Sequence, residues 1–119
     1  MSELKILVRD ERRSFRPGEA VEGVAGWRLD QPPKSVELRL FWFTRGKGTD
    51  DVGVVNQVRL DAPQLEEGRK FSFTLPAEPF SFSGRLISLI WAIELVVEPG
   101  GRSARYDFVM SPTGAEILL

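Results

Sequence analysis

The chain has 119 residues, with 16 Lys and Arg against 17 Asp and Glu, and it contains neither cysteine nor histidine. This length fits one unit, so we expect residues 1–119 to form a single domain. Without Cys there are no disulfides, thiolate nucleophiles or Cys-ligated zinc. Without His the commonest metal ligand and the usual acid–base group near neutral pH are missing. A Ser-His-Asp or Cys-His catalytic site therefore cannot be built from this chain.

Charge and hydropathy restrict the partners. The formal net charge is −1, whereas a nucleic-acid-binding protein needs a basic excess to neutralise phosphates. The richest apolar run, residues 86–97, is interrupted by Ser88 and Glu94 and is shorter than the ~20 residues that span a bilayer. We therefore expect no nucleic-acid partner, no transmembrane segment and a cytoplasmic location.

Apolar and polar residues alternate with a period of two, which is typical of strands. In chain order, this alternation covers residues 4–8, 21–29, 36–42, 52–60, 71–75, 87–97 and 104–110. Turn residues separate the segments at 16–18, 31–33, 46–48, 76–84 and 99–101. Residues 62–68 show no strand pattern, and we interpret them as a loop. Seven strands at this spacing predict an all-β fold, an immunoglobulin-like antiparallel β-sandwich.

The connections add detail to this prediction. The short segment 98–102 predicts a hairpin between the last two long strands, and the polar segment 45–51 suits a hairpin or a crossing between sheets. Pro17 and Gly18 predict a type II turn, and Gly23 and Gly26, inside a strand, indicate a bulge or the close approach of another backbone. We expect segment 76–84 to pack onto the sandwich edge through its two phenylalanines.

Several motifs resemble those of one protein family. Residues 15–23, Phe-Arg-Pro-Gly-Glu-Ala-Val-Glu-Gly, look like the signature that opens arrestin-like domains. The succession in residues 71–76, 79–84 and 86–93 is similar to later motifs of that family, in the family's order. The resemblance covers roughly residues 3–110. It implies an arrestin N-terminal-type sandwich in a bacterial-type, single-domain member, with a general role in protein binding.

Candidate chemical sites are weak. The carboxylate pairs Asp50-Asp51 and Glu66-Glu67 supply too few oxygens for calcium, which takes six to eight, and we interpret them as solvated loop charges. We expect no metal, no cofactor, no catalytic residues and no enzymatic activity. The three tryptophans are in phase with aliphatic neighbours, which favours core packing. A carbohydrate-stacking platform stays open as an alternative.

Two strands break the expected alternation. Phe41 and Phe43 lie on the face opposite Leu38 and its neighbours, and Ile90 and Val96 likewise oppose the Trp91 face. If the two strands are neighbours, these four residues form an apolar patch outside the core, at which a partner or a second copy binds. A register-flipping bulge, or a cover made by residues 79–84, would equally explain the pattern.

The favoured hypothesis is a non-enzymatic, arrestin-like adaptor or scaffold domain. It would bind protein through candidate residues Phe41, Phe43, Ile90 and Val96, or by strand addition at a sheet edge. The alternative is a β-sandwich module that binds a small molecule or carbohydrate.

Overall fold

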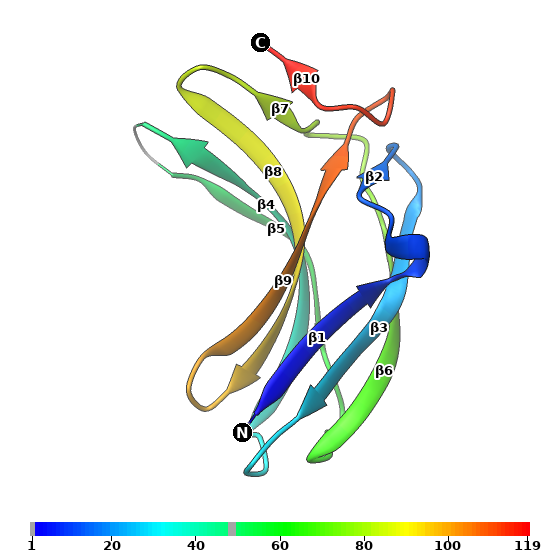
Figure 1. Ribbon diagram of the computed structural model, residues 1–119, viewed down its shortest axis with the longest axis vertical. Helices are drawn as coiled ribbons and strands as arrows, with labels where there is room; N and C mark the ends of the chain where they lie inside the picture. Colours follow the sequence, from blue (N-terminus) through cyan, green and yellow to red (C-terminus); the bar gives the residue numbers. More distant parts are fainter. Residues whose placement is uncertain (1, 48–49) are drawn as a thin grey trace.

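The computed structural model describes residues 2–47 and 50–119, which form two packed β-sheets (Figure 1). The smaller sheet has the order β1-β3-β6, with antiparallel pairing throughout. Its strands are β1 (Glu3–Val8), β3 (Ala20–Arg28) and β6 (Glu66–Thr74). The prediction that residues 62–68 form a loop is therefore wrong for residues 66–68, which belong to β6. Cross-strand pairing with β3 extends β6 back to Glu66, although residues 66–70 include no apolar side chain that would mark a strand in the sequence.

The larger sheet contains four long antiparallel strands in the order β5-β4-β8-β9. They are β4 (Ser35–Gly46), β5 (Val52–Arg59), β8 (Ile87–Glu98) and β9 (Arg102–Met110). The seven predicted strands and the sandwich fold class are thus confirmed. A turn of 3-10 helix, η1 (Arg9–Glu11), and the two-residue strands β2 (Ser14–Phe15), β7 (Phe82–Ser83) and β10 (Ile117–Leu118) add to them.

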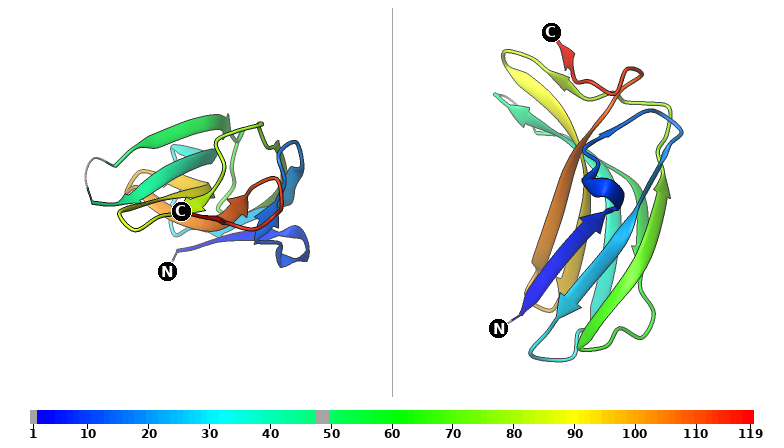
Figure 2. Two further views of the ribbon diagram at one scale, coloured as in Figure 1. Left: turned by 90° about the horizontal axis from the view of Figure 1, so that it is seen from above. Right: turned by 45° about the vertical axis from the view of Figure 1, so that its right-hand side comes forward.

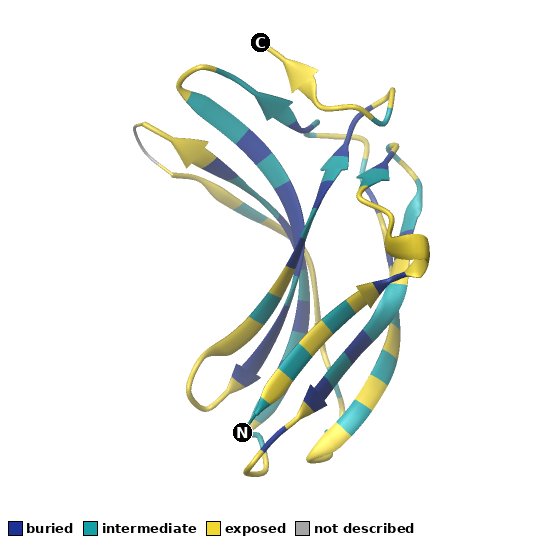
Figure 3. Cartoon of the chain, viewed as in Figure 1, coloured by how far each residue is buried: buried dark blue, intermediate teal, exposed yellow. Residues whose placement is uncertain are grey.

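The core lies between the sheets, where the alternating apolar residues of both inner faces meet (Figure 3). Trp91 is fully buried at its centre, and its ring stacks on Phe108 with centroids 6.3 Å apart. Its indole N–H donates to the Pro79 carbonyl over 2.7 Å, which satisfies the polar group of a buried tryptophan. Burying each large apolar side chain stabilises the fold by about 1.5–3 kcal/mol.

The predicted connections take shape as expected. The Glu19 N–H donates to the Arg16 carbonyl, and Gly18 has φ of 84°, which makes the Pro17-Gly18 turn type II. Strands β8 and β9 form the predicted hairpin. Strands β4 and β5 are also antiparallel neighbours, although residues 48 and 49 of their connection lie outside the described residues.

One side of the sandwich is closed and the other is open. Strand β1 contacts β9 and β8 across the two sheets. The view from above in Figure 2 shows how the two layers face each other. On the opposite side, β5 and β6 are the outermost strands, and neither pairs with a further strand among the described residues. Two sheet edges are therefore free on this side.

Candidate interaction surface

Phe41 and Phe43 lie on the outer face of the larger sheet, away from the core. The β4–β8 pairing is continuous over twelve positions, with Phe43 opposite Ile90 and Phe41 opposite Ala92. The buried core cluster includes Leu40 of β4 but neither phenylalanine. Strand β4 therefore has no flipped register, and its doubled apolar pattern reflects two apolar faces.

The segment proposed as a cover does not account for the outer face. Phe80 and Phe82 pack against the core, and the Ser81 N–H donates to the Met110 carbonyl over 2.8 Å. This confirms that segment 76–84 folds back onto the sandwich. Because its phenylalanines turn inward, they leave Phe43 and Ile90 on a partly exposed surface.

Side chains around Phe43 explain its partial burial. The Phe41 and Phe43 ring centroids are 5.8 Å apart. The Arg105 guanidinium carbon lies 4.6 Å from the Phe43 centroid, and that of Arg45 lies 5.7 Å from it. Such cation–π contacts contribute about 0.5–1 kcal/mol each at exposed sites. Phe41 is thus only 8% exposed, and the guanidinium groups of Arg45 and Arg105 lie beside Phe43.

Strand β5 extends the patch to the edge of the sheet. Val52 pairs with Phe43 and Val54 with Phe41, so both valines share the outer face. Their exposed fractions are 63% and 54%, and most of β5 is exposed in Figure 3. We call the set Phe41, Phe43, Val52, Val54 and Ile90 the outer apolar surface.

Sequence reasoning missed the two valines because it treated 52–60 as one alternating face. The β4–β5 register shifts at Leu40/Phe41, which leaves Val55 as an extra residue in β5. Because of this bulge, Val52 and Val54 lie on the outer face, whereas Asn56 and Val58 lie on the inner face. The adjacent Val54-Val55 pair, which breaks the period of two, was the available signal.

Val96 lies on the same face but is separated from the outer apolar surface. Between them runs a charged row in which Arg39 of β4, Glu94 of β8 and Arg105 of β9 occupy adjacent cross-strand positions. Arg39 forms an ion pair with Glu37 at 3.2 Å, and Arg105 forms one with Asp107 at 2.8 Å. The structure therefore brings three of the four candidate residues together and places Val96, which is buried, beyond a polar rim.

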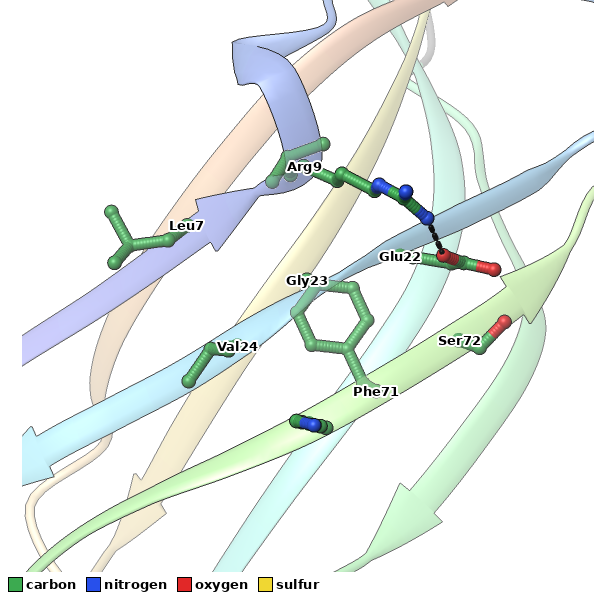
Figure 4. Close-up of a pocket in the computed structure, with 9 residues that line it drawn as sticks. Leu7, Arg9, Glu22, Gly23, Val24, Phe71 and Ser72 are labelled. Carbon is green, nitrogen blue, oxygen red and sulfur yellow. Dashed lines mark hydrogen bonds and ion pairs between the residues drawn. The ribbon is translucent and has the colours of Figure 1, made fainter.

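The smaller sheet carries an open pocket of about 650 Å³ (Figure 4). Its apolar lining includes Leu7, Val24 and Phe71, and an Arg9–Glu22 ion pair of 3.2 Å borders it. Gly23 also lines the pocket, and a Cβ there would lie 2.0 Å from the Leu7 carbonyl oxygen. The close backbone approach is thus confirmed for Gly23, whereas for Gly26 it is wrong, since no atom would lie nearer than 3.8 Å to a Cβ there.

The remaining candidates from the sequence are the paired carboxylates and the three tryptophans. Glu67 accepts hydrogen bonds from Arg69 and the Gln64 N–H, which lower the pKa of its carboxyl. Trp27 and Trp91 are buried, while the indole of the half-buried Trp42 packs against Gly53.

Within residues 2–47 and 50–119, no group of three Asp or Glu side chains is placed to hold a metal ion. Over the same residues, no helix is long and apolar enough to cross a membrane.

Comparison with solved structures places this arrangement among known folds. No protein-family model matches the chain, and no curated protein is significantly similar to it in sequence. The sporulation control protein Spo0M from Bacillus subtilis, which has an arrestin-like fold, superposes with a TM-score of 0.63 at 18% identity. That match covers 92% of this chain and 49% of Spo0M, so the chain spans about half the length of this neighbour.

A second group of neighbours shares the architecture only. The β-glucosidase from Listeria innocua, in complex with gluconolactone, matches with a TM-score of 0.52 at 12% identity. This chain aligns over 99% of its length with 16% of the enzyme. The same enzyme's D270A mutant, in complex with laminaribiose, gives a TM-score of 0.52. At these identities the likeness concerns the fold, a β-sandwich compatible with the arrestin-like type.

Proposed function

We propose that this protein is a non-enzymatic, arrestin-like regulatory or adaptor domain that binds another protein in the cytoplasm through its outer apolar surface. The observation that carries the proposal is the position of this surface: Phe43 and Ile90 on the exposed face continue into Val52 and Val54 at a free sheet edge. Contiguous apolar surface with a polar rim is typical of protein interaction sites.

The surface has the anatomy of an interface. Phe43 is partly exposed and packs against the buried Phe41, and aromatic residues of this kind are enriched at protein interfaces. Arg45 and Arg105 at their border offer guanidinium groups that pair with carboxylates and stack on aromatic rings. The charged row through Arg39 and Glu94 bounds the apolar area on one side. A partner with an apolar centre and acidic margins would match this arrangement.

Two further points support a regulatory role without enzymatic activity. Spo0M is a sporulation control protein, and by analogy this chain would act on a regulatory partner. The composition lacks His and Cys, the groups on which most acid–base and nucleophilic sites depend.

The test is affinity capture with matched variants. Tagged wild type, Phe43→Glu and Leu7→Glu are immobilised, and proteins retained from the native host are compared. Leu7 is also exposed and apolar but lies on the smaller sheet. We expect at least one protein to be retained by wild type and Leu7→Glu and lost with Phe43→Glu. Identical sets for all three baits would contradict the proposal.

A further inference from the structure

Strand β5 is the unprotected edge of this fold. Proteins normally defend free edges with charged side chains. Strand β6, the free edge of the smaller sheet, carries Glu66, Glu67, Arg69 and Lys70 within nine residues. Strand β5 carries one charge, Arg59, within eight residues, together with four exposed valines. Two edges on the same side of one sandwich thus differ sharply in their protection.

The hydrogen-bonding groups of β5 show which residues are available. The Thr44 N–H donates to the Asp51 carbonyl, and the Leu60 N–H donates to the Val36 carbonyl. Backbone groups alternate in direction along a strand, so those of Asp51 and Leu60 turn toward β4. Counting inward from both ends, Val52, Val54, Gln57 and Arg59 direct their N–H and C=O groups to the free edge. Their side chains share the outer face.

We propose that β5 pairs antiparallel with β5 of a second copy of this chain, forming a two-fold dimer whose larger sheets are continuous. In one register Val52 faces Arg59 of the second copy and Val54 faces Gln57. All four of these residues present edge-directed backbone groups, so both members of each pair can exchange hydrogen bonds. The inference rests on the proposed function, since the dimer joins two outer apolar surfaces into one bivalent surface.

Charge selects both the occupant and the direction. Asp50 and Asp51 lie at the start of β5 and Arg59 at its end, all exposed. The Arg59 guanidinium forms no ion pair in the described part of the chain, although Glu37 of β4 is its cross-strand neighbour. Antiparallel pairing brings Asp50 and Asp51 of each copy toward the end of β5 that holds Arg59 in the other, twice by symmetry, whereas parallel pairing would bring the two acidic starts together. Asp61 lies at the same end as Arg59, so Arg59 is the residue that favours the antiparallel direction.

The order of the strands in the larger sheet explains why the assembly would stop at a dimer. Strand β5 is one margin of the larger sheet, and at the other margin β9 contacts β1 and pairs with β2. Among the described residues, β5 is the one long unprotected edge, since the further margin strand β10 (Ile117–Leu118) has two residues, so an isologous pair through β5 ends the assembly and does not grow into a fibre.

The test is sedimentation velocity over a concentration series, with three variants that each change one exposed or partly exposed residue. We expect wild type to show a monomer–dimer equilibrium. Val54→Lys places a charge on the edge and should weaken self-association by about tenfold or more. Leu7→Lys, on the other sheet, and Ile90→Lys, on the outer face away from the edge, should leave it within about twofold.

Charge reversal provides a second arm that does not depend on any one variant. Arg59→Asp leaves acidic residues at both strand ends, and the double variant Asp50→Lys with Asp51→Lys turns the start of the strand basic, opposite the end that holds Arg59 in the second copy. Each variant alone should associate about tenfold more weakly than wild type, and an equimolar mixture should form heterodimers of nearly wild-type affinity. A mixture no stronger than its components would overturn the antiparallel β5 pairing.

Failure here is distinguishable from failure of the proposed function. A wild type that remains monomeric at every concentration, or a dimer abolished by Ile90→Lys and unaffected by Val54→Lys, would overturn the edge-to-edge dimer. Either result would leave Phe43-dependent capture of a different protein intact. Conversely, capture that does not depend on Phe43 would contradict the adaptor function while leaving the dimer in place.

Discussion

Gly23 shows how a single residue is constrained by the distance between two backbones. A Cβ at this position would lie 2.0 Å from the Leu7 carbonyl oxygen and 2.9 Å from the Phe71 ring. At Gly26, three residues further along the same strand, the nearest atom to a Cβ is the Glu67 carbonyl oxygen at 3.8 Å. Two glycines in one strand therefore differ in whether a side chain fits.

We expect Gly23→Ala to lower the free energy of unfolding by about 1–3 kcal/mol, because the backbone of β1 must move to admit the methyl group. Gly26→Ala is the matched control and should lie within about 1 kcal/mol of wild type, since it limits the unfolded chain without a clash. Urea denaturation measures both. Equal effects of the two substitutions would contradict the close approach at Gly23.

Glu19 provides a prediction for pH. The Arg16 backbone N–H, 2.6 Å away, and the Arg12 guanidinium lower the pKa of this carboxyl below 4.5 in the folded protein. The unfolded state then binds a proton more readily, so the stabilisation is complete above the unfolded pKa. It is lost as the pH falls through the lower, folded pKa.

Acid titrations of wild type and Glu19→Gln, followed by thermal unfolding, test this dependence. We expect the stability difference between the two proteins to shrink progressively as the pH falls below about 4.5, because protonation removes the carboxylate that Glu19→Gln lacks. A difference that stays constant between neutral and strongly acid pH would show that Glu19 has no such role.

At the level of elements, one buried serine contributes a side-chain hydrogen bond that attaches segment 76–84 to the sheet. Ser81 is 1% exposed, and its hydroxyl oxygen accepts the Met110 N–H over 2.9 Å. Ser83, two residues later, is half-buried, and its side chain has no hydrogen bond within the described residues. The first serine thus satisfies a backbone donor of β9, and the second does not.

We expect Ser81→Ala to cost about 1–3 kcal/mol of stability, because it leaves a buried N–H without an acceptor. Ser83→Ala should change stability by no more than about 0.5 kcal/mol. Thermal unfolding of the two variants checks the difference, and Ser81→Ala as stable as Ser83→Ala would exclude this attachment.

Elements also show where sequence reasoning succeeds and where it stops. Alternation in β4 and β8 identified Phe41, Phe43 and Ile90, because a continuous register leaves the period of two intact. It failed in β5, where the bulge at Val55 reverses the side-chain direction between Val54 and Asn56. Nor does alternation separate Val96 from the other three candidates, since only the pairing of β4, β8 and β9 reveals the charged row in between. The sequence predicts which face of a strand a side chain occupies, but it does not predict which residues of other strands lie beside it.

On the scale of the whole molecule, the three tryptophans report how completely the two sheets enclose the core. Trp91 and Trp27 are 0% and 4% exposed, while Trp42 lies half-buried near the β4–β5 connection. We expect iodide to quench only the Trp42 emission, and Trp42→Phe to remove the quenchable fraction altogether. Substantial quenching that persists in Trp42→Phe would contradict the packing and revive an exposed aromatic platform.

The architecture as a whole followed from composition and turns, since seven alternating segments separated by Pro and Gly specify a sandwich. The interaction surface did not, because it depends on which strand is left at the edge. Strand order arises from long-range pairing, and no local pattern in residues 52–59 marks them as an edge strand.

The central claim is that the free edge of β5, continuous with the outer apolar surface, is where this protein associates. Amide hydrogen exchange followed by NMR at low and high protein concentration tests it most directly. We expect the edge-directed amides of Val52, Val54, Gln57 and Arg59 to exchange rapidly in dilute solution and to become protected at high concentration, while β6 amides remain unchanged. Exchange at these four amides that is equally fast at both concentrations would contradict the account.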